Sequence, residues 1–292
     1  KYSYRVGDGK NWSEWFQFKT SATTAKQFSF IYFGDVQNDI KSLGSRTLRQ
    51  AYSHFPDADF MLFAGDIVST SNEAYWNEFF YAGGWIFGRM RSIVTGGNHE
   101  FDKKDDQRVF SKLWNQIYQM PENGPGEKYK NRNYYLDYQG VRFVSLDSPS
   151  LGYYPEDSAL VINWLEKTLA SNPNRWPVGF THYPVYSCSQ GRNNETYRNT
   201  VQPILEKYNV ELVLAGHDHT YCRGFNTDHV MIKGKNPPLY VVSVAGPKMY
   251  GLNTSFWSDR VASSTQLYQH ISVNDNQLEY KSFDVTGDLY DH

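Results

Sequence analysis

Short apolar runs alternate with amphipathic segments over most of the chain, which is the pattern of an α/β domain. Each run holds four to six residues, which is long enough for a buried strand but too short for a typical helix. The runs that predict strands lie at residues 28–33, 60–64, 92–95, 141–146, 178–181, 211–215 and 239–244. We therefore expect a layered structure whose strands come mostly from residue 28 onward.

Two of the segments between these runs repeat apolar residues at helical spacing. The first consists of Leu160, Val161, Trp164, Leu165 and Leu169. The second consists of Val201, Ile204, Leu205 and Tyr208, at positions i, i+3, i+4 and i+7. Each segment predicts a helix that packs one apolar face against a sheet.

Both ends of the chain have the pattern of a hairpin. Residues 1–20 alternate aromatic and polar side chains around a Gly-Asp-Gly turn. Residues 268–285 also have a hairpin pattern, with a polar turn at 274–276. Residues 21–26 are small or polar, as in a linker. The pattern therefore predicts a β-rich segment in front of the α/β domain.

Composition excludes some classes of partner. The chain has 292 residues, of which 40% are hydrophobic and 21% charged, as in an ordinary globular protein. A net charge of -2 offers no electrostatic basis for binding nucleic acid or an anionic membrane. No run of eighteen apolar residues is present, so we expect no membrane span. Nothing in the sequence indicates an oligomeric state.

The two cysteines, Cys188 and Cys222, are too few for a disulfide framework. They form either one bridge between loops or two separate thiols, and the sequence leaves both open.

Five predicted strands end in residues that bind metal ions. The fragments are GDVQ (34–37), GDIVS (65–69), GGNHE (96–100), THYP (181–184) and GHDH (216–219). A single Gly-Asp pair is more often a simple turn than a ligand. Five such fragments, each after its own strand, predict one site, because sites of α/β sheets gather at the carboxyl ends of strands. Carboxylates, amide oxygens and imidazoles are ligands of divalent metal ions.

In this order, the five fragments resemble the motifs of the calcineurin-like metallophosphoesterases, and specifically those of the purple acid phosphatase branch. The resemblance runs from Phe28 to the C-terminus and implies a four-layer α-β-β-α sandwich around two metal ions. Residues 1–24 resemble the last strands of the fibronectin-like domain that precedes the catalytic domain in that branch, which leaves 25–292 as the metallophosphoesterase domain. The resemblance also suggests export, to a secreted, periplasmic or cell-surface location.

The resemblance assigns a role to each candidate site residue. Asp66 would bridge the two metals, and His99 would face the substrate and stabilise or protonate the leaving oxygen. The remaining ligands would be Asp35 and His219 on the first metal, and Asn98, His182 and His217 on the second.

Three positions depart from the family pattern. Ser69 stands where the purple branch has a metal-binding Tyr, and Gln37 stands where the wider superfamily has a His. Gln37 can offer an amide oxygen, so we expect it as a ligand of the first metal. Arg192 lies near the place of the purple branch's substrate-facing histidines, where its planar fork suits phosphate. A solvated loop arginine remains the alternative reading for Arg192.

The implied function is hydrolysis of small phosphoesters by a metal-bound hydroxide, with two divalent ions (Mn, Zn or Fe) as cofactors and phosphomonoesters as substrates. Two alternatives stay open. One is a phosphodiesterase or nucleotide hydrolase on the same site. The other is a binding module without catalysis, whose first metal site has degraded. No nucleic-acid partner is expected.

The absence of the Tyr ligand generates a first prediction. Without a phenolate the site is less anionic, which disfavours Fe(III) and favours divalent ions. The metal-loaded protein should therefore be colourless, which an absorption spectrum of the iron-reconstituted protein checks. A visible iron–phenolate band would contradict this prediction.

Overall fold

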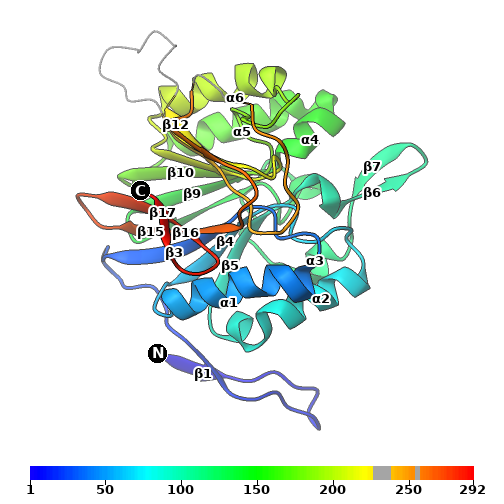
Figure 1. The fold of residues 1–292 in the computed structure, drawn as a ribbon, viewed down its shortest axis with the longest axis vertical. Coiled ribbons are helices and arrows are strands. Elements are labelled where there is room, and N and C mark those ends of the chain that lie inside the picture. Colours follow the sequence, from blue (N-terminus) through cyan, green and yellow to red (C-terminus); the bar gives the residue numbers. More distant parts are fainter. Residues whose placement is uncertain (226–237, 254–256) are drawn as a thin grey trace.

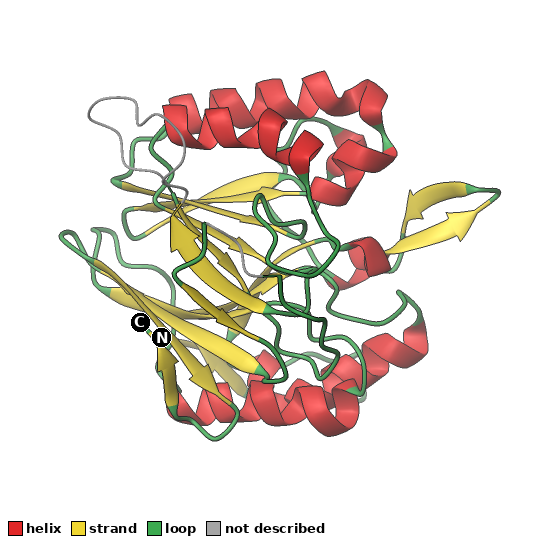
Figure 2. Ribbon diagram, turned by 45° about the horizontal axis from the view of Figure 1, so that its top comes forward, coloured by secondary structure: helices red, strands yellow, loops and turns green. Residues whose placement is uncertain are grey.

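The computed structural model describes residues 1–225, 238–253 and 257–292. Two β-sheets lie face to face, and helices cover the outer face of each sheet (Figure 1). Figure 2 shows the helices separated to the two outer sides, with the strands between them. The arrangement is a four-layer α-β-β-α sandwich, as expected from the sequence.

The first sheet holds the strands nearest the start of the domain. Its members are β3 (Phe28–Phe33), β4 (Phe60–Ala64), β5 (Arg91–Thr95), β15 (Leu267–Val273), β16 (Leu278–Asp284) and β17 (Leu289–Asp291). They follow the order β17-β16-β15-β3-β4-β5. Strands β3, β4 and β5 are parallel, so their carboxyl ends meet at one edge. The C-terminal hairpin joins antiparallel to β3 through β15.

The second sheet is built from the middle of the chain. Its members are β8 (Tyr134–Tyr138), β9 (Val141–Leu146), β10 (Trp176–Thr181), β11 (Leu212–Ala215), β12 (Tyr221–Phe225), β13 (Leu239–Val242) and β14 (Arg260–Ala262). They follow the order β14-β12-β13-β11-β10-β9-β8. Strands β9, β10, β11 and β13 are parallel, so this sheet also gathers its carboxyl ends at one edge.

Helices and two small hairpins complete the fold. The helices are α1 (Ser45–His54), α2 (Glu73–Gly83), α3 (Trp114–Ile117), α4 (Ser148–Tyr153), α5 (Ser158–Ala170) and α6 (Glu195–Lys207). The hairpins are β1 (Tyr2–Tyr4) with β2 (Phe16–Phe18), and β6 (Phe101–Lys104) with β7 (Gln107–Phe110). The β6–β7 hairpin projects from the body (Figure 2). Among the described helices, none combines the length and apolar character needed to cross a bilayer.

Aromatic side chains fill the space between the sheets. Phe30 and Phe60 stack with ring centroids 5.1 Å apart, and Phe143 from the opposite sheet meets both rings edge-on. Offset stacks and edge-to-face contacts are the favoured geometries of aromatic pairs. A second apolar cluster lies between the first sheet and its helices, and a third lies between the second sheet and its helices. The sheets are therefore held rigidly against each other, which fixes the position of the edge where their strands end.

All seven predicted strands are present, with ends that differ by at most two residues from those expected. The predicted face of α5 was wrong at one position. Leu160 is 49% exposed, whereas Val161 and Leu165 are buried. The buried stripe is centred on Val161 and Leu165, so Leu160, one residue before it, points to solvent.

A buried ion pair ties the chain before β8 to the end of β9. Arg132 Nη1 lies 2.6 Å from Asp147 Oδ2, and both side chains are almost fully buried. The Asp147 carboxylate also accepts from the backbone N–H of Ser150 at the start of α4. Removing the arginine would leave a buried carboxylate without its counter-charge.

We therefore expect Arg132→Met to lower the free energy of unfolding by about 3–5 kcal/mol. The matched control is Lys103→Met, which breaks the exposed Lys103–Asp106 pair and should change little. Urea denaturation of both variants and of the unaltered protein measures the two losses. Equal losses in the two variants would show that the buried pair does not stabilise the fold in this way.

Candidate metal centre

The turns that follow β3, β4, β5, β10 and β11 bring their polar side chains to one place. The first three strands belong to one sheet and the last two to the other, so the site lies where the carboxyl edges of both sheets meet. The side chains that gather there are those expected from the sequence: Asp35, Gln37, Asp66, Asn98, His99, His182, His217 and His219.

His182 is the centre of one group of donors. Its Nε2 lies 3.1 Å from Asn98 Oδ1, 3.2 Å from Asp66 Oδ2 and 3.2 Å from His217 Nδ1. Its Nδ1 lies 2.9 Å from the carbonyl oxygen of Ala64, to which it donates, and this contact holds the ring in place. Asp66, His182 and His217 can each offer one ligand atom within 4.8 Å of the others. This group has the composition expected for the second metal.

His219 and Asp35 form the other group. His219 Nδ1 lies 2.9 Å from the carbonyl oxygen of Lys248, and His219 Nε2 lies 3.1 Å from Asp35 Oδ2. Both side chains are buried. A carbonyl oxygen accepts only, so the ring proton belongs on Nδ1 and Nε2 carries a lone pair. The lone pairs of Nε2 and Oδ2 therefore face each other at contact distance.

Asp66 stands between the two groups. Its Oδ2 lies 3.2 Å from His182 Nε2 on one side and accepts from Gln37 Nε2 at 3.0 Å on the other. Its backbone has a φ of 45°, in the left-handed region, which turns the carboxylate out of the line of β4. Asp66 therefore lies between the two groups of donors, and its role as a carboxylate shared by two metal ions stays a prediction.

Two buried oxygen atoms in the cluster lack hydrogen-bond partners in the described part of the chain, which bears on whether a cation fits here. Asp35 Oδ2 and Gln37 Oε1 are buried and have no hydrogen-bond donor among the described residues. Leaving such groups unsatisfied costs about 1–3 kcal/mol each, and more for a charged group. A cation between the carboxylates and the imidazoles would satisfy Asp35 and remove the lone-pair repulsion. The donor set of oxygens and imidazole nitrogens suits Mn²⁺, Zn²⁺ or Fe²⁺.

The pKa shifts of the clustered side chains also favour a bound cation. Burial alone would lower the pKa of His182, but the neighbouring Asp66 carboxylate raises it to about 9. Burial opposes ionisation of Asp66, yet the imidazoles of His182 and His99 hold the pKa of that carboxyl below its ordinary value. Burial lowers the pKa of His217 and of His219, which keeps both rings neutral, as metal ligands must be.

Two of the three departures from the family pattern, Gln37 and Ser69, lie close to Asp66 or to His99, which follows Asn98. Gln37 is fully buried between Asp66 and His219, with its Nε2 rather than its Oε1 turned toward them. A half-turn of the amide would exchange the two atoms, so Gln37 as a ligand stays a prediction. Ser69 Oγ accepts from the backbone N–H of Asn38, and Ser69 O lies 2.6 Å from His99 Nδ1. Ser69 therefore helps to orient His99.

His99 and Arg192 lie at the edge of the cluster. The His99 side chain is 33% exposed, and its Nε2 lies 3.9 Å from Asp66 Oδ2. Arg192 Nη1 donates to the carbonyl oxygen of His217 at 3.2 Å and to Asp218 Oδ1 at 3.3 Å. The guanidinium is therefore held beside the second group of donors, although half of its fork is engaged by the protein.

Glycines allow the turns to approach so closely. A Cβ on Gly65, whose φ is 79°, would lie 2.7 Å from His182 Nδ1. A Cβ on Gly216 would lie 2.2 Å from Asp35 Oδ1. No side chain fits at either position, so Gly65 is required by both space and backbone conformation, and Gly216 by space.

Sequence reasoning missed the part played by Glu100. This fully buried carboxylate accepts from the backbone N–H groups of Asp66, Ile67 and Val68, and from that of Gly97. Burial, together with the nearby Asp66 carboxylate, raises the pKa of Glu100 to about 8. Glu100 thus clamps the turn that carries Asp66 onto the turn that carries Asn98. Its place directly after the Asn-His pair was the available signal.

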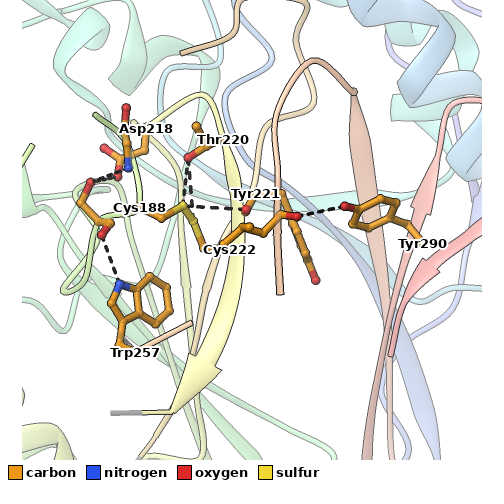
Figure 3. Close-up of a disulfide and its surroundings, with 10 residues drawn as sticks. Cys188, Asp218, Thr220, Tyr221, Cys222, Trp257 and Tyr290 are labelled. Carbon is orange, nitrogen blue, oxygen red and sulfur yellow. Dashed lines mark hydrogen bonds between the residues drawn. A yellow bond between two sulfur atoms is a disulfide. The ribbon is translucent and has the colours of Figure 1, made fainter. Parts of the chain in front are cut away.

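Cys188 and Cys222 form a disulfide, with Cα atoms 6.4 Å apart (Figure 3). The sequence left open either a disulfide or two separate thiols, and the structure shows the disulfide. Figure 3 also shows Asp218, which accepts from Ser187 Oγ near the bridge. The bridge joins the loop that follows His182 to β12, which begins two residues after His219, so it restrains two of the ligand-bearing segments.

An α-β-β-α sandwich with this donor cluster at the shared edge of its sheets belongs to the metallophosphoesterase class. The chain belongs to the calcineurin-like phosphoesterase family, because the family's model matches residues 28–221.

Comparisons with single proteins point to the purple acid phosphatase branch of that family. The chain is 28% identical to purple acid phosphatase 21 of Arabidopsis thaliana, over 88% of this chain and 57% of the relative. It is 25% identical to the Fe(3+)-Zn(2+) purple acid phosphatase 12 of the same plant, over 97% of this chain and 63% of the relative. Its fold matches that of purple acid phosphatase PPD1 from yellow lupin (Lupinus luteus) seeds with a TM-score of 0.76 and 20% identity, over 96% of this chain and 56% of that chain. The chain thus spans less than two thirds of each.

The Glu100 clamp generates a prediction for metal binding. Glu100→Gln offers one acceptor oxygen in place of two and points an N–H₂ group at a backbone donor. We expect it to weaken metal affinity by about 10–100-fold, as does the loss of a group that orients a metal ligand. Competition with a chelator measures the affinity. Glu73→Gln, at the exposed start of α2, is the matched control and should bind metal as the unaltered protein does. Unchanged affinity in Glu100→Gln would contradict the positioning role.

Proposed function

We propose that the chain hydrolyses phosphomonoesters at a two-metal centre, in the manner of an acid phosphatase. The observation that carries the proposal is that buried carboxylates and imidazoles form two adjoining groups, His182 beside Asp66 and His219 beside Asp35, at the shared edge of the sheets. The family and the purple acid phosphatase relatives support the same reading.

The residues that would hold the ions form two sets that share Asp66. The first set is Asp35, His219 and Gln37, and the second is Asn98, His182 and His217. When bound, two divalent ions supply the charge that holds phosphoryl oxygens and lowers the pKa of a water toward ~7. One relative is named for iron(III) and zinc. The absence of a phenolate at Ser69 favours two divalent ions in this chain instead.

His99 and Arg192 would act on the substrate. Contact between His99 Nδ1 and Ser69 O directs Nε2 toward Asp66, where it can give a proton to the leaving alcohol. Arg192 keeps one terminal nitrogen and Nε free of the two contacts that anchor it, so it can donate to a phosphoryl oxygen.

Two further parts of the proposal concern the surroundings of the domain. We place the protein outside the cytosol, in a secreted, periplasmic or cell-surface location, because the Cys188–Cys222 disulfide suits an oxidising compartment. We assign residues 1–24 to the end of a fibronectin-like domain, since the β1–β2 hairpin pairs antiparallel and belongs to neither of the two large sheets.

The direct test is metal analysis followed by a panel of mono- and diesters. We expect two equivalents of metal, and faster turnover of an aryl monoester than of the matching diester. Asp66→Asn should lower kcat by more than the ~10–100-fold that follows the loss of a group orienting a metal ligand, because it removes the negative charge of the shared carboxylate. Asp57→Asn, exposed and remote from the site, is the control. Faster turnover of diesters would indicate a phosphodiesterase, and bound metal without any turnover would indicate a binding module.

A further inference from the structure

Asp218 is a buried carboxylate that belongs to neither group of donors. It stands between His217 and His219 in the turn after β11, and its side chain is fully buried. His217 and His219 both have a positive φ, of 73° and 47°, and their rings join the two groups of donors. The Asp218 carboxylate instead accepts from Ser187 Oγ, in the loop between β10 and α6 (Figure 3). A buried charge of this kind requires a counter-charge.

The counter-charge is Arg192. Among the described residues it is the only cation that forms an ion pair with Asp218, with Nη1 3.3 Å from Oδ1. The same Nη1 donates to the carbonyl oxygen of His217 at 3.2 Å. The guanidinium carbon also lies 4.9 Å from the centre of the Tyr250 ring, and that ring lies 4.8 Å from the ring of His219. Arg192 is therefore fixed against the turn that carries one proposed ligand of each metal.

The geometry of this ion pair differs from that of two other pairs in the protein. Arg142 binds Asp137 through Nε and Nη2, each 2.8 Å from a carboxylate oxygen. Arg223 binds Asp291 through the same two atoms, at 2.7 and 2.9 Å. The Nε–Nη2 edge of a guanidinium matches two oxygens at once, and both pairs use it. In Arg192 that edge makes no hydrogen bond with the described residues, and the side chain is 28% exposed.

An arginine that is held at one nitrogen and open along its other edge suits a ligand with two oxygens. A phosphoryl group presents two such oxygens, as a carboxylate does. The carboxylate of Asp218 and the carbonyl oxygen of His217 engage Nη1 alone, so they fix the guanidinium without filling its Nε–Nη2 edge. Because the long side chain is already ordered, binding a ligand costs less conformational entropy.

We propose that Asp218 is a positioning residue, which holds Nη1 of Arg192 so that the Nε–Nη2 edge stays available to the phosphoryl oxygens of the substrate. Asp218 itself does not touch the substrate. Ser187 donates to the other carboxylate oxygen and keeps the Asp218 side chain from turning. The inference rests on the proposed function and deepens it, because it names the group that places Arg192.

Charge and position predict opposite results when the carboxylate is removed. By charge alone, the loss of an anion near the site would strengthen the binding of a doubly negative phosphate ester. Loss of position would weaken that binding, because Arg192 would be free to move away. The sign of the change in affinity therefore identifies the role of Asp218.

The test is Asp218→Ala in the metal-loaded protein. We expect it to raise KM for 4-nitrophenyl phosphate about tenfold, as the loss of a hydrogen bond to a charged group does. Metal content and kcat should not change, because a contact made equally in the ground and transition states alters KM alone. Calorimetry with inorganic phosphate should show the same loss of affinity. Asp137→Ala, which breaks the pair with Arg142, is the matched control and should leave KM unchanged.

A conservative variant tests the role again, should Asp218→Ala fold poorly. Asp218→Asn keeps the shape of the side chain and one acceptor oxygen. We expect it to raise KM only about threefold, because a neutral acceptor bonds about half as strongly as a charged one.

A double-mutant cycle with Arg192→Ala separates positioning from a general effect on the site. If Asp218 acts through Arg192, then neither Asp218 substitution raises KM further once Arg192 is replaced by Ala. A full further rise in the double variant would overturn the inference.

The remaining outcomes separate this inference from the proposed function. An unchanged or lower KM in the Asp218 variants would overturn the positioning role alone. A fall in kcat and metal content at unchanged KM would show that Asp218 only stabilises the turn, which also overturns it. Failure of the unaltered, metal-loaded protein to hydrolyse the ester would overturn the proposed function, and this inference with it.

Discussion

The site depends on one electrostatic constraint: buried carboxylates and imidazoles turn their lone pairs toward the same small space. Backbone carbonyls enforce this orientation. The Nδ1–H of His182 donates to Ala64 O, which leaves its Nε2 facing Asp66. The Nδ1–H of His219 donates to Lys248 O, which leaves its Nε2 facing Asp35. Without a cation, the neutral His219 ring and the Asp35 carboxylate would repel each other in a region of low dielectric constant, and His182 would have to bind a proton beside Asp66, which is why the pKa of His182 is raised. Cations resolve that conflict, and the donor types present are those that divalent metals prefer.

Much of the surrounding structure serves to hold this unfavourable arrangement in place. Aromatic packing between the sheets fixes the edge at which the strands end. Glu100 joins the turns that carry Asp66 and Asn98, while the disulfide restrains the segments after His182 and His219. Gly65 and Gly216 let the turns approach to distances that no side chain would permit. Charge, turn geometry and covalent bonding therefore act on the same few residues.

By itself the sequence determined the strands, the layered α/β class and the residue types at the strand ends. Runs of apolar residues and the residues that end them are local features, and burial of a strand is decided largely by its own composition. Only the tertiary structure decided which distant groups meet: the Glu100 clamp, the Cys188–Cys222 bridge, the orientation of Gln37 and the exposure of Leu160. Each of these depends on a partner or a packing direction supplied by another part of the chain. Local pattern carries no information about such partners until the two sheets are packed together.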